Sequence, residues 1–321
     1  MTERSESGIQ WGVAVPVSEG ETVRRKLISD QLYDRTYRPF VRDGYLYIPV
    51  VTAVEGAAET LFPLSPVRED LARHEQVGGL VILQEDDAEA AASVLKNRPN
   101  VHTVLYATSP IEGEFRTRSF KVLAGTPTTQ TTYTEYGHKM IVDLSAAYFS
   151  ARLSNERRRL LSLMHEGEQV LDMFAGVGPF AVTLGEKCRM MVANDLNPQA
   201  IELMQQNLRM NKIHNVVPVL GDACNLPDLF PDMKFDRIIM NLPFAAYAFL
   251  EAAAKLAAKT CTIHLYSLVE REGEHTEDIL KVFPSARIQE KYIRSYSPTS
   301  WHAVYDIEIS EQADTSRQPL R

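Results

Sequence analysis

Four polar motifs in the second half of the chain have the residue types and spacing of a binding site for an adenosine-containing cofactor. Each follows a short apolar run, and they are Asp172–Phe180, Asn194–Pro198, Gly221–Ala223 and Asn241–Phe244. Glycines in the first motif allow backbone to come close to a ligand, and its proline suits the first turn of a helix. A plain turn between strand and helix is the simpler interpretation of a lone G-x-G.

Carboxylates in these motifs indicate which cofactor would bind. Asp172 stands where a dinucleotide would bring its pyrophosphate, so its charge disfavours NAD and favours the cationic amino group of S-adenosylmethionine. Asp195, about twenty residues beyond the glycines, can accept hydrogen bonds from ribose hydroxyls. Asp222 can accept one from an adenine amino group, although either residue could instead cap a helix or a turn. The predicted cofactor-binding residues are Asp172, Phe174, Gly176, Gly178, Asp195, Leu196, Asp222, Ala223 and Asn241.

The fourth motif, Asn241-Leu-Pro243-Phe244, suits the recognition of a flat nucleobase. The Asn241 amide offers both a donor and an acceptor, and the backbone offers carbonyls. An aromatic residue at position 244 also suggests a base-stacking enzyme that methylates an exocyclic amine. Methylation of cytosine C5 is disfavoured because that chemistry needs a nucleophilic cysteine near the motif. The three cysteines are far apart and no histidine lies at metal-ligand spacing, so we expect free thiols and no metal.

The elements that must position these motifs alternate between strand and helix. Such alternation predicts a mostly parallel, doubly wound sheet over residues 147–321, the α/β fold of a class I (Rossmann-like) methyltransferase, with ligands at the carboxyl ends of its strands. The Gly176–Ala181 segment also fits G-x-G-x-x-A, so a nicotinamide-dependent oxidoreductase is the alternative. The expected strands are 169–174, 190–195, 217–220 and 235–240, with a helix at 198–211.

Two small α/β or α+β domains are expected to precede this sheet. Residues 1–53 form the first, and residues 54–68, which contain two prolines, form a linker. Residues 69–146 form a middle α/β domain. The expected strands are 12–16, 45–50, 80–83, 103–106 and 120–123, and the expected helices are 23–32 and 88–95.

The charge of the chain argues against a nucleic-acid partner until it is counted by segment. The 321 residues hold 34 lysines and arginines against 42 acidic residues, a net charge of −8. Residues 51–100 hold nine acids against four bases, whereas residues 1–50 hold seven of each. Phosphate contacts are local, so basic surfaces elsewhere stay possible. No run approaches the ~18 apolar residues of a membrane span, and the polar N-terminus does not resemble a secretory signal, so we expect a cytoplasmic protein without membrane contact.

At these motifs the sequence resembles the archaeal and eukaryotic tRNA methyltransferases that act on N1 of guanosine 37, next to the anticodon. The resemblance covers nearly the whole chain. It implies S-adenosylmethionine as cofactor, tRNA as partner, a monomeric enzyme and tRNA recognition by the first domain. The matching segments are Phe115–Arg118, Tyr148–Arg157, Leu171–Phe180, Ile239–Pro243, Ile293–Pro298 and Trp301-His302.

The resemblance also implies roles for single residues. Glu156 is expected to be the general base for the N1 proton, and Arg116 to stabilise charge on O6. Asn241 and Pro243 would position the base edge. The expected substrate-binding and loop-supporting residues are Tyr148, Arg152, Arg157 and Arg118.

Elementary chemistry agrees with these roles. N1 of guanine carries a proton at neutral pH, so its methylation requires a base. Charge that develops on O6 is best stabilised by a fixed guanidinium, and methyl transfer depends mostly on orientation. Two alternatives stay open: Glu156 could be a solvated helix charge, and Arg116 and Arg118 could be surface residues of a strand. We expect the three consecutive arginines, Arg157, Arg158 and Arg159, to contact phosphates.

Three other functions fit the same motifs. One is methylation of a tricyclic wyosine precursor at the same tRNA position, and another is methylation of a nucleobase amino group. A tRNA-binding adaptor without activity is the non-enzymatic alternative. Such an adaptor would not need the cofactor-facing motifs, all of which are intact in this sequence.

Overall fold

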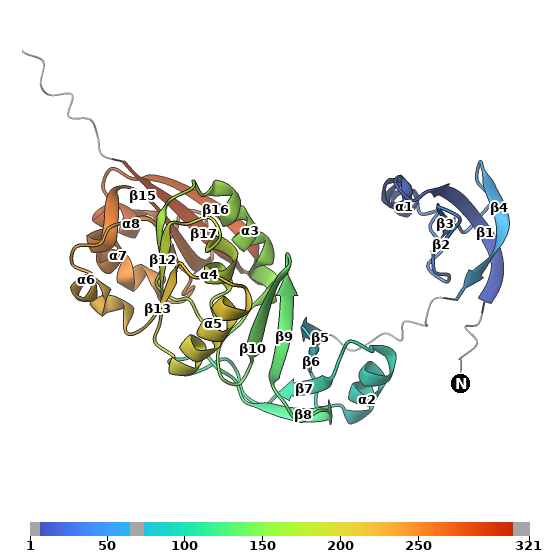
Figure 1. Ribbon diagram of the computed structural model, residues 1–321, viewed down its shortest axis with the longest axis horizontal. Helices are drawn as coiled ribbons and strands as arrows, with labels where there is room; N and C mark the ends of the chain where they lie inside the picture. Colours follow the sequence, from blue (N-terminus) through green and yellow to red (C-terminus); the bar gives the residue numbers. More distant parts are fainter. Residues whose placement is uncertain (1–6, 65–73, 311–321) are drawn as a thin grey trace, which may run out of the picture. The chain divides into compact units, whose positions relative to one another are not determined.

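The computed structural model describes residues 7–64 and 74–310, which belong to two compact units, 1–71 and 72–321 (Figure 1). The first unit is an antiparallel sheet in the order β2-β3-β1-β4 with one helix, α1 (Gly20–Ser29). Its strands are β1 (Ser7–Pro16), β2 (Phe40–Arg42), β3 (Tyr45–Pro49) and β4 (Ala57–Pro63). Leu27, Ile48 and Val50 are the buried centre of its core.

The predicted linker is wrong over its first part. Ala57–Pro63 is strand β4, which pairs with β1 along its whole length. The proline that suggested a linker ends this edge strand, a position where the missing N–H costs no ladder hydrogen bond. Residues 65–68 of the predicted linker lie outside the described residues.

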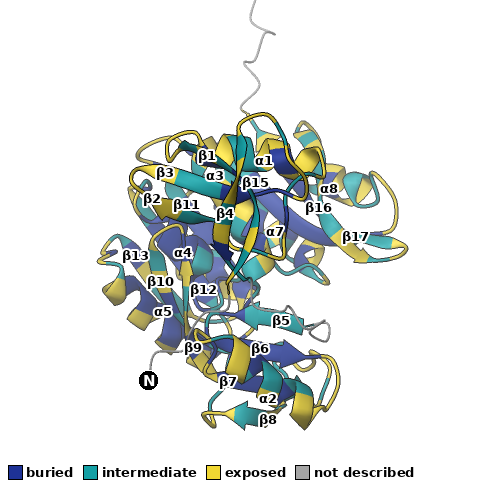
Figure 2. Cartoon of the chain, turned by 90° about the vertical axis from the view of Figure 1, so that its right-hand side faces the viewer, coloured by how far each residue is buried: buried dark blue, intermediate teal, exposed yellow. Residues whose placement is uncertain are grey.

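The second unit begins with a small sheet in the order β5-β6-β7-β8. Its strands are β5 (His74–Val77), β6 (Leu80–Leu83), β7 (Thr103–Ala107) and β8 (Phe120–Gly125), and helix α2 (Ala88–Asn97) connects β6 to β7. The side chain of Asp87 caps α2 by accepting hydrogen bonds from two backbone N–H groups. All four residues of β6 are buried, and the strand is dark blue in Figure 2. The predicted strands and helix of this region are confirmed.

A hairpin joins this small sheet to the rest of the second unit. It consists of β9 (Gln130–Glu135) and β10 (His138–Asp143). The side-chain amide of Asn207 accepts from the backbone N–H of Ile141 and donates to its carbonyl, which ties β10 to helix α5. Residues 72–321 therefore form one compact unit, and the predicted separate middle domain at 69–146 is not observed.

The large sheet has the order β13-β12-β11-β14-β15-β17-β16. Its first five strands are parallel, and β17 runs antiparallel between β15 and β16. This arrangement confirms the predicted mostly parallel α/β sheet. The strands are β11 (Gln169–Asp172), β12 (Met190–Asp195), β13 (Val216–Leu220), β14 (Phe235–Met240), β15 (Ala257–Val269), β16 (Arg287–Ser297) and β17 (Ser300–Ile309).

Helices cover both faces of the large sheet (Figure 1). One face packs against α3 (Ser154–Leu163), α4 (Pro179–Leu184) and α5 (Pro198–Met210). The other packs against α6 (Leu226–Leu229), α7 (Leu250–Leu256) and α8 (Thr276–Val282). Strand order reverses between β11 and β14, which opens a crevice at their carboxyl ends. Within the described residues, no helix is long and apolar enough to cross a membrane.

Candidate active site

A cleft lies at the carboxyl ends of β11, β12, β13 and β14, with a volume of about 320 Å³. We call it the cofactor cleft because seven of the nine predicted cofactor-binding residues line it. These seven are Phe174, Gly176, Asp195, Leu196, Asp222, Ala223 and Asn241. The parallel strands thus bring four motifs together that are far apart in the chain.

Backbone N–H groups fix two of the carboxylates that line the cleft, Asp195 and Asp222. Asp195 accepts hydrogen bonds from the N–H of Gly176 at 2.6 Å and of Asn197 at 2.9 Å. Asp222 accepts from the N–H of Cys224 at 2.8 Å and caps a short 3₁₀ helix. A carboxylate has about four acceptor positions, so both side chains keep lone pairs for a ligand. Capping and ligand binding are compatible here.

Two of the predicted cofactor-binding residues do not line the cleft. Asp172 is fully buried and does not line the cleft, and burial raises its pKa to about 8. One of its oxygens, Oδ2, is buried without a hydrogen-bond partner, and its predicted interaction with the ammonium group of the cofactor stays a prediction. Gly178 does not line the cleft either: its φ is +83°, and a Cβ there would lie 2.6 Å from Cγ of Met204. It makes the turn into α4.

The polar lining of the cleft fits a ligand rich in hydrogen-bond donors. The side-chain oxygens of Asn194 and Asn241 are buried and have no partner in the structure. S-adenosylmethionine carries an ammonium group and an adenine amino group, which can satisfy such acceptors. Sequence reasoning missed Asn194 as a lining residue, because its burial depends on the packing of β12. Among the described residues, no three or more His, Cys, Asp or Glu side chains form a group that could hold a metal ion.

A second cavity of about 340 Å³, which we call the side pocket, adjoins the cleft. The two cavities share the lining residues Arg116, Tyr148, Phe149, Ser150 and Pro243. The side pocket is further lined by Glu75, Arg118, Arg152, Phe244, Arg294, Tyr296 and His302, among others. The predicted residues Arg116, Arg118, Tyr148, Arg152 and Pro243 thus meet in one place.

Arg116 lies at the border of the two cavities in a strained backbone conformation. Its φ is +54°, in the turn between β7 and β8, so the alternative that it is a surface residue of a strand is wrong. Its guanidinium lies 4.5 Å from the ring centroid of Phe244 and 5.4 Å from that of Tyr148. These cation–π contacts hold a positive charge in the lining that both cavities share.

Phe244, the exposed aromatic residue that suggested base stacking, contacts other side chains of the protein. The ring of Phe244 packs against the guanidinium of Arg116 and lies 6.0 Å from the ring of Tyr296. The ring face that carries the Arg116 guanidinium is not free for a nucleobase, whereas the side chain as a whole stays exposed. The Arg116–Phe244 contact therefore weakens the argument from Phe244 for exocyclic-amine methylation.

The predicted phosphate contacts of Arg157 and Arg159 are wrong, because both guanidinium groups are engaged inside the protein. Arg157 is buried and forms a bidentate ion pair with Glu135, with N–O distances of 2.7 and 2.5 Å. It also donates to the carbonyl of Ser150, in the segment shared by both cavities. This contact fits the loop-supporting role that the resemblance implies. Arg158 is exposed and lies over the ring of Tyr136.

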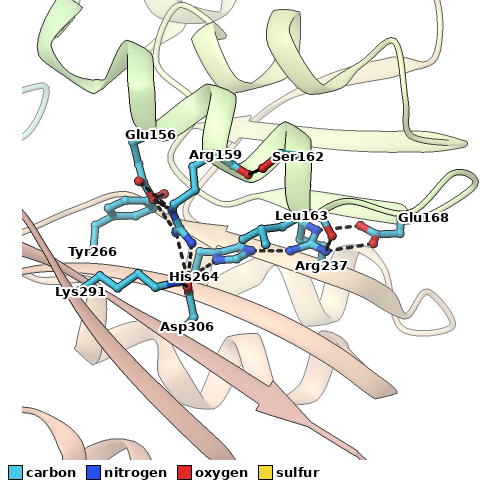
Figure 3. A network of polar contacts seen from close by, with 10 residues as sticks. All are labelled: Glu156, Arg159, Ser162, Leu163, Glu168, Arg237, His264, Tyr266, Lys291 and Asp306. Atoms are coloured by element: carbon cyan, nitrogen blue, oxygen red, sulfur yellow. Dashed lines mark hydrogen bonds and ion pairs between the residues drawn. The ribbon is translucent and has the colours of Figure 1, made fainter.

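Glu156 lines neither cavity. Its buried carboxylate accepts hydrogen bonds from Arg159 at 2.6 to 3.0 Å and from the Tyr266 hydroxyl at 2.8 Å. The alternative of a solvated helix charge is therefore wrong. Figure 3 shows that Glu156 is one end of a set of connected side chains, which we call the buried charge network. Its members are Glu156, Arg159, Glu168, Arg237, His264, Tyr266, Lys291 and Asp306.

The hydrogen bonds of this network fix the protonation state of His264. Arg237 can only donate, so His264 Nε2 accepts from it at 2.5 Å and Nδ1–H donates to Asp306 at 2.6 Å. Burial lowers the pKa of His264, consistent with this neutral tautomer. Burial alone would raise the pKa of Asp306, but hydrogen bonds from His264 and Arg159 lower it far below its usual range.

Comparison with known proteins points in one direction. A model described as the TRM5/TYW2 methyltransferase domain matches residues 131–291, and one for the tRNA methyltransferase 5 N-terminal domain matches residues 12–59. The tRNA (guanine(37)-N(1))-methyltransferase Trm5b of Pyrococcus abyssi is 34% identical, covering 93% of this chain and 98% of that protein. The tRNA 4-demethylwyosine(37)-methyltransferase Taw21 of Saccharolobus solfataricus is 32% identical over 74% of this chain and 94% of its own.

Solved structures agree with the sequence comparison. The chain resembles aTrm5 in its complex with tRNALeu, with a TM-score of 0.69 and 27% identity, over 94% of this chain and 100% of that one. The similarity extends beyond the methyltransferase fold, because it includes the residues that precede the large sheet.

Proposed function

The chain belongs to the TRM5/TYW2 methyltransferase family, and we infer that it transfers the methyl group of S-adenosylmethionine to N1 of guanosine 37 in tRNA. The observation that carries this conclusion is the match to a guanine-37 methyltransferase over 93% of the chain. The N-terminal domain model strengthens it. The wyosine-precursor methyltransferase matches only 74% of the chain. tRNA is the macromolecular partner.

The cofactor cleft holds S-adenosylmethionine in this proposal. Asp195 accepts from the ribose hydroxyls and Asp222 from the adenine amino group, while Asn194 supplies an unpaired acceptor. When bound, the cofactor supplies an electrophilic methyl group on a sulfonium and leaves as S-adenosylhomocysteine. The flipped guanine enters the side pocket, and its N1 reaches the border of the two cavities beside Asn241 and Pro243.

Arg116 stabilises the charge that develops on O6 as the N1 proton leaves. Its guanidinium stands at the border of the cavities, held by the rings of Phe244 and Tyr148. A charge fixed before the reaction needs no reorganisation during it, which is how such groups lower a barrier. Arg118 and Arg152 line the same pocket and supply further donors to the nucleotide.

Glu156 is proposed as the general base that takes the N1 proton. Because its carboxylate is bound to Arg159 and Tyr266 and lines neither cavity, the role requires it to exchange a present partner for the guanine N1–H. Hydrogen bonds of catalytic groups are often poorly aligned before substrate binds. The N1–H bond then breaks toward the carboxylate as the N1–methyl bond forms.

Methylation of unmodified tRNA transcripts tests the proposed function. Transcripts carrying G or A next to the anticodon are incubated with the full chain and S-adenosylmethionine, and the products are identified by nucleoside mass analysis. We expect 1-methylguanosine from the G transcript and no product from the A transcript. An N6-methyladenosine product would favour amino-group chemistry, and methylation restricted to tRNA that carries the wyosine precursor would favour that alternative.

Ligand binding separates the enzyme classes independently of turnover. We expect S-adenosylhomocysteine to bind and NADH not to bind; the reverse would contradict the proposal. A chain that retained tRNA without incorporating methyl groups would be an adaptor. A monomeric state and a cytoplasmic location stay predictions, and analytical ultracentrifugation tests the first.

A further inference from the structure

His302 on β17 is a buried imidazole without hydrogen-bond partners in the wall of the side pocket. The residue is 3% exposed, and neither Nδ1 nor Nε2 has a partner. By contrast, His264, another buried histidine on this sheet, has hydrogen-bond partners at both of its ring nitrogens. Unpaired buried polar groups are costly and rare, so each calls for an explanation. A pocket wall that carries one is a site where a ligand group can complete the hydrogen bonds.

The imidazole is neutral near pH 7. Burial, together with the positive charges of Arg294 and Arg116, lowers its pKa to about 4, against a smaller opposing effect of Glu156. A neutral imidazole has one donor nitrogen and one acceptor nitrogen, whereas the arginines of the pocket can only donate. Glu75 is paired with Arg152 at 3.5 Å. Among the described residues, His302 is thus the one buried side chain of the pocket lining with an unpaired acceptor.

Guanine needs acceptors of this kind. Its Watson–Crick edge carries one acceptor, O6, and three hydrogens, one on N1 and two on the exocyclic amino group. In the proposed function, Arg116 donates to O6 and Glu156 takes the N1 hydrogen. Both hydrogens of the amino group therefore still need acceptors. Asn241 offers an unpaired oxygen from the cleft side, and His302 offers a nitrogen from the opposite strand hairpin.

We propose that His302 accepts a hydrogen bond from the exocyclic amino group of guanine 37, which makes it a specificity-determining residue of the side pocket. This inference rests on the proposed function. It predicts that the enzyme uses His302 to distinguish guanosine from inosine, which has hydrogen in place of the amino group. A merely structural role of His302 would affect both substrates equally.

The test compares His302→Phe with the unchanged protein on transcripts that carry guanosine or inosine at position 37. Phenylalanine keeps the ring that packs 6.0 Å from Tyr266 but has no acceptor. We expect kcat/KM on guanosine to fall about tenfold, the value of one hydrogen bond. On inosine the two proteins should differ by less than about twofold. Equal losses on both transcripts, or no loss on guanosine, would overturn the inference.

Matched variants isolate the acceptor. Arg294 pairs in register with His302 and lines the same pocket, but its guanidinium can only donate hydrogen bonds. A loss of kcat/KM in Arg294→Ala should therefore be equally large on the guanosine and the inosine transcript. His302→Asn keeps a polar atom near Nδ1 and should recover part of the guanosine rate. If His302→Phe lowers the Tm or the affinity for S-adenosylhomocysteine, His302→Leu repeats the comparison. If the unchanged protein methylates neither transcript, the proposed function has failed rather than the role of His302.

Discussion

The buried charge network and the side pocket differ in whether their buried polar groups have hydrogen-bond partners. In the network three carboxylates, Glu156, Glu168 and Asp306, face three cations, and each has hydrogen-bonded partners. In the side pocket, Nε of Arg294 and both nitrogens of His302 are buried without partners. Satisfied buried groups hold a fold together, whereas unsatisfied ones in a cavity wall indicate where a ligand binds.

The two regions meet at a single side chain. Tyr266 donates its hydroxyl hydrogen to Glu156 of the network, and its ring lies 6.0 Å from the ring of His302 in the pocket wall. Burial raises the pKa of Tyr266, and so does the neighbouring Glu156, so the hydroxyl stays a donor at neutral pH. The network thereby supports one wall of the pocket.

Replacing Asp306 by asparagine should have the largest effect, and the effect should be on stability. The change leaves Arg159 and Lys291 without the carboxylate that both contact. Arg159 keeps its ion pair with Glu156, but Lys291 and His264 lose the charged partner, and removal of one partner from a buried ion pair costs about 3 kcal/mol. Chemical denaturation should show this loss, while the folded fraction should bind S-adenosylhomocysteine normally. Unchanged stability would show that the network is not a stabilising element.

The same pair of proteins should differ in pH dependence. The pKa of Asp306 is lowered in the folded protein, so its stabilising effect is present above the ordinary carboxyl pKa near 4 and is lost as pH falls below it. The Tm difference between the unchanged protein and Asp306→Asn should therefore shrink below about pH 4. A constant difference down to pH 3 would contradict the assignment.

Glu156→Gln tests whether one member of the network also takes part in chemistry. Glutamine keeps the shape and the acceptor for Tyr266 but is not a base. We expect single-turnover methylation to fall about a hundredfold or more, with tRNA affinity nearly unchanged. Methylation at the unchanged rate would exclude Glu156 as the base and leave it a purely structural residue.

Asp195→Asn tests the cofactor cleft. An asparagine amide can replace only part of the carboxylate's bonding, because one of its two polar atoms is a donor that faces the N–H of Gly176 or of Asn197. Calorimetry should show about tenfold weaker binding of S-adenosylhomocysteine, equivalent to ~1.4 kcal/mol. An equal fall in affinity for tRNA would contradict a role confined to the cofactor.

The smallest effect is expected at the rim of the side pocket. Phe244→Ala removes the ring that lies 4.5 Å from the guanidinium of Arg116. Exposed cation–π contacts contribute ~0.5–1 kcal/mol, so kcat/KM should fall about threefold. Phe244→Tyr keeps the ring and should retain most activity. A loss as large as that of Glu156→Gln would mean that Phe244 touches the base itself.

Local patterns were enough to predict the cofactor cleft. Apolar runs that alternate with helices predict parallel strands, and the carboxyl ends of such strands meet at one edge. Motifs placed directly after β11, β12 and β14 therefore had to converge. Asp172 and Gly178 belong to the right motif but do not line the cleft, because Asp172 is fully buried and Gly178 packs on Met204.

The ionisable residues outside these motifs were harder to predict. Three consecutive arginines look alike in sequence, yet Arg157 and Arg159 are paired inside the protein and Arg158 is exposed, because a helix turns successive side chains to different faces. The family resemblance marks Glu156 and the Trp301-His302 pair, but it does not give their surroundings.

The sequence by itself determined the fold class, the cofactor type and the residues at the strand ends, because these depend on hydrophobic periodicity and on short-range turn chemistry. Only the tertiary structure decided which charges are paired and which polar atoms are left for a ligand. That depends on β17 lying antiparallel between β15 and β16, which places Asp306 beside His264 and His302 beside Arg294. Such contacts join residues up to 147 positions apart, as between Arg159 and Asp306, and a local pattern carries no information about them.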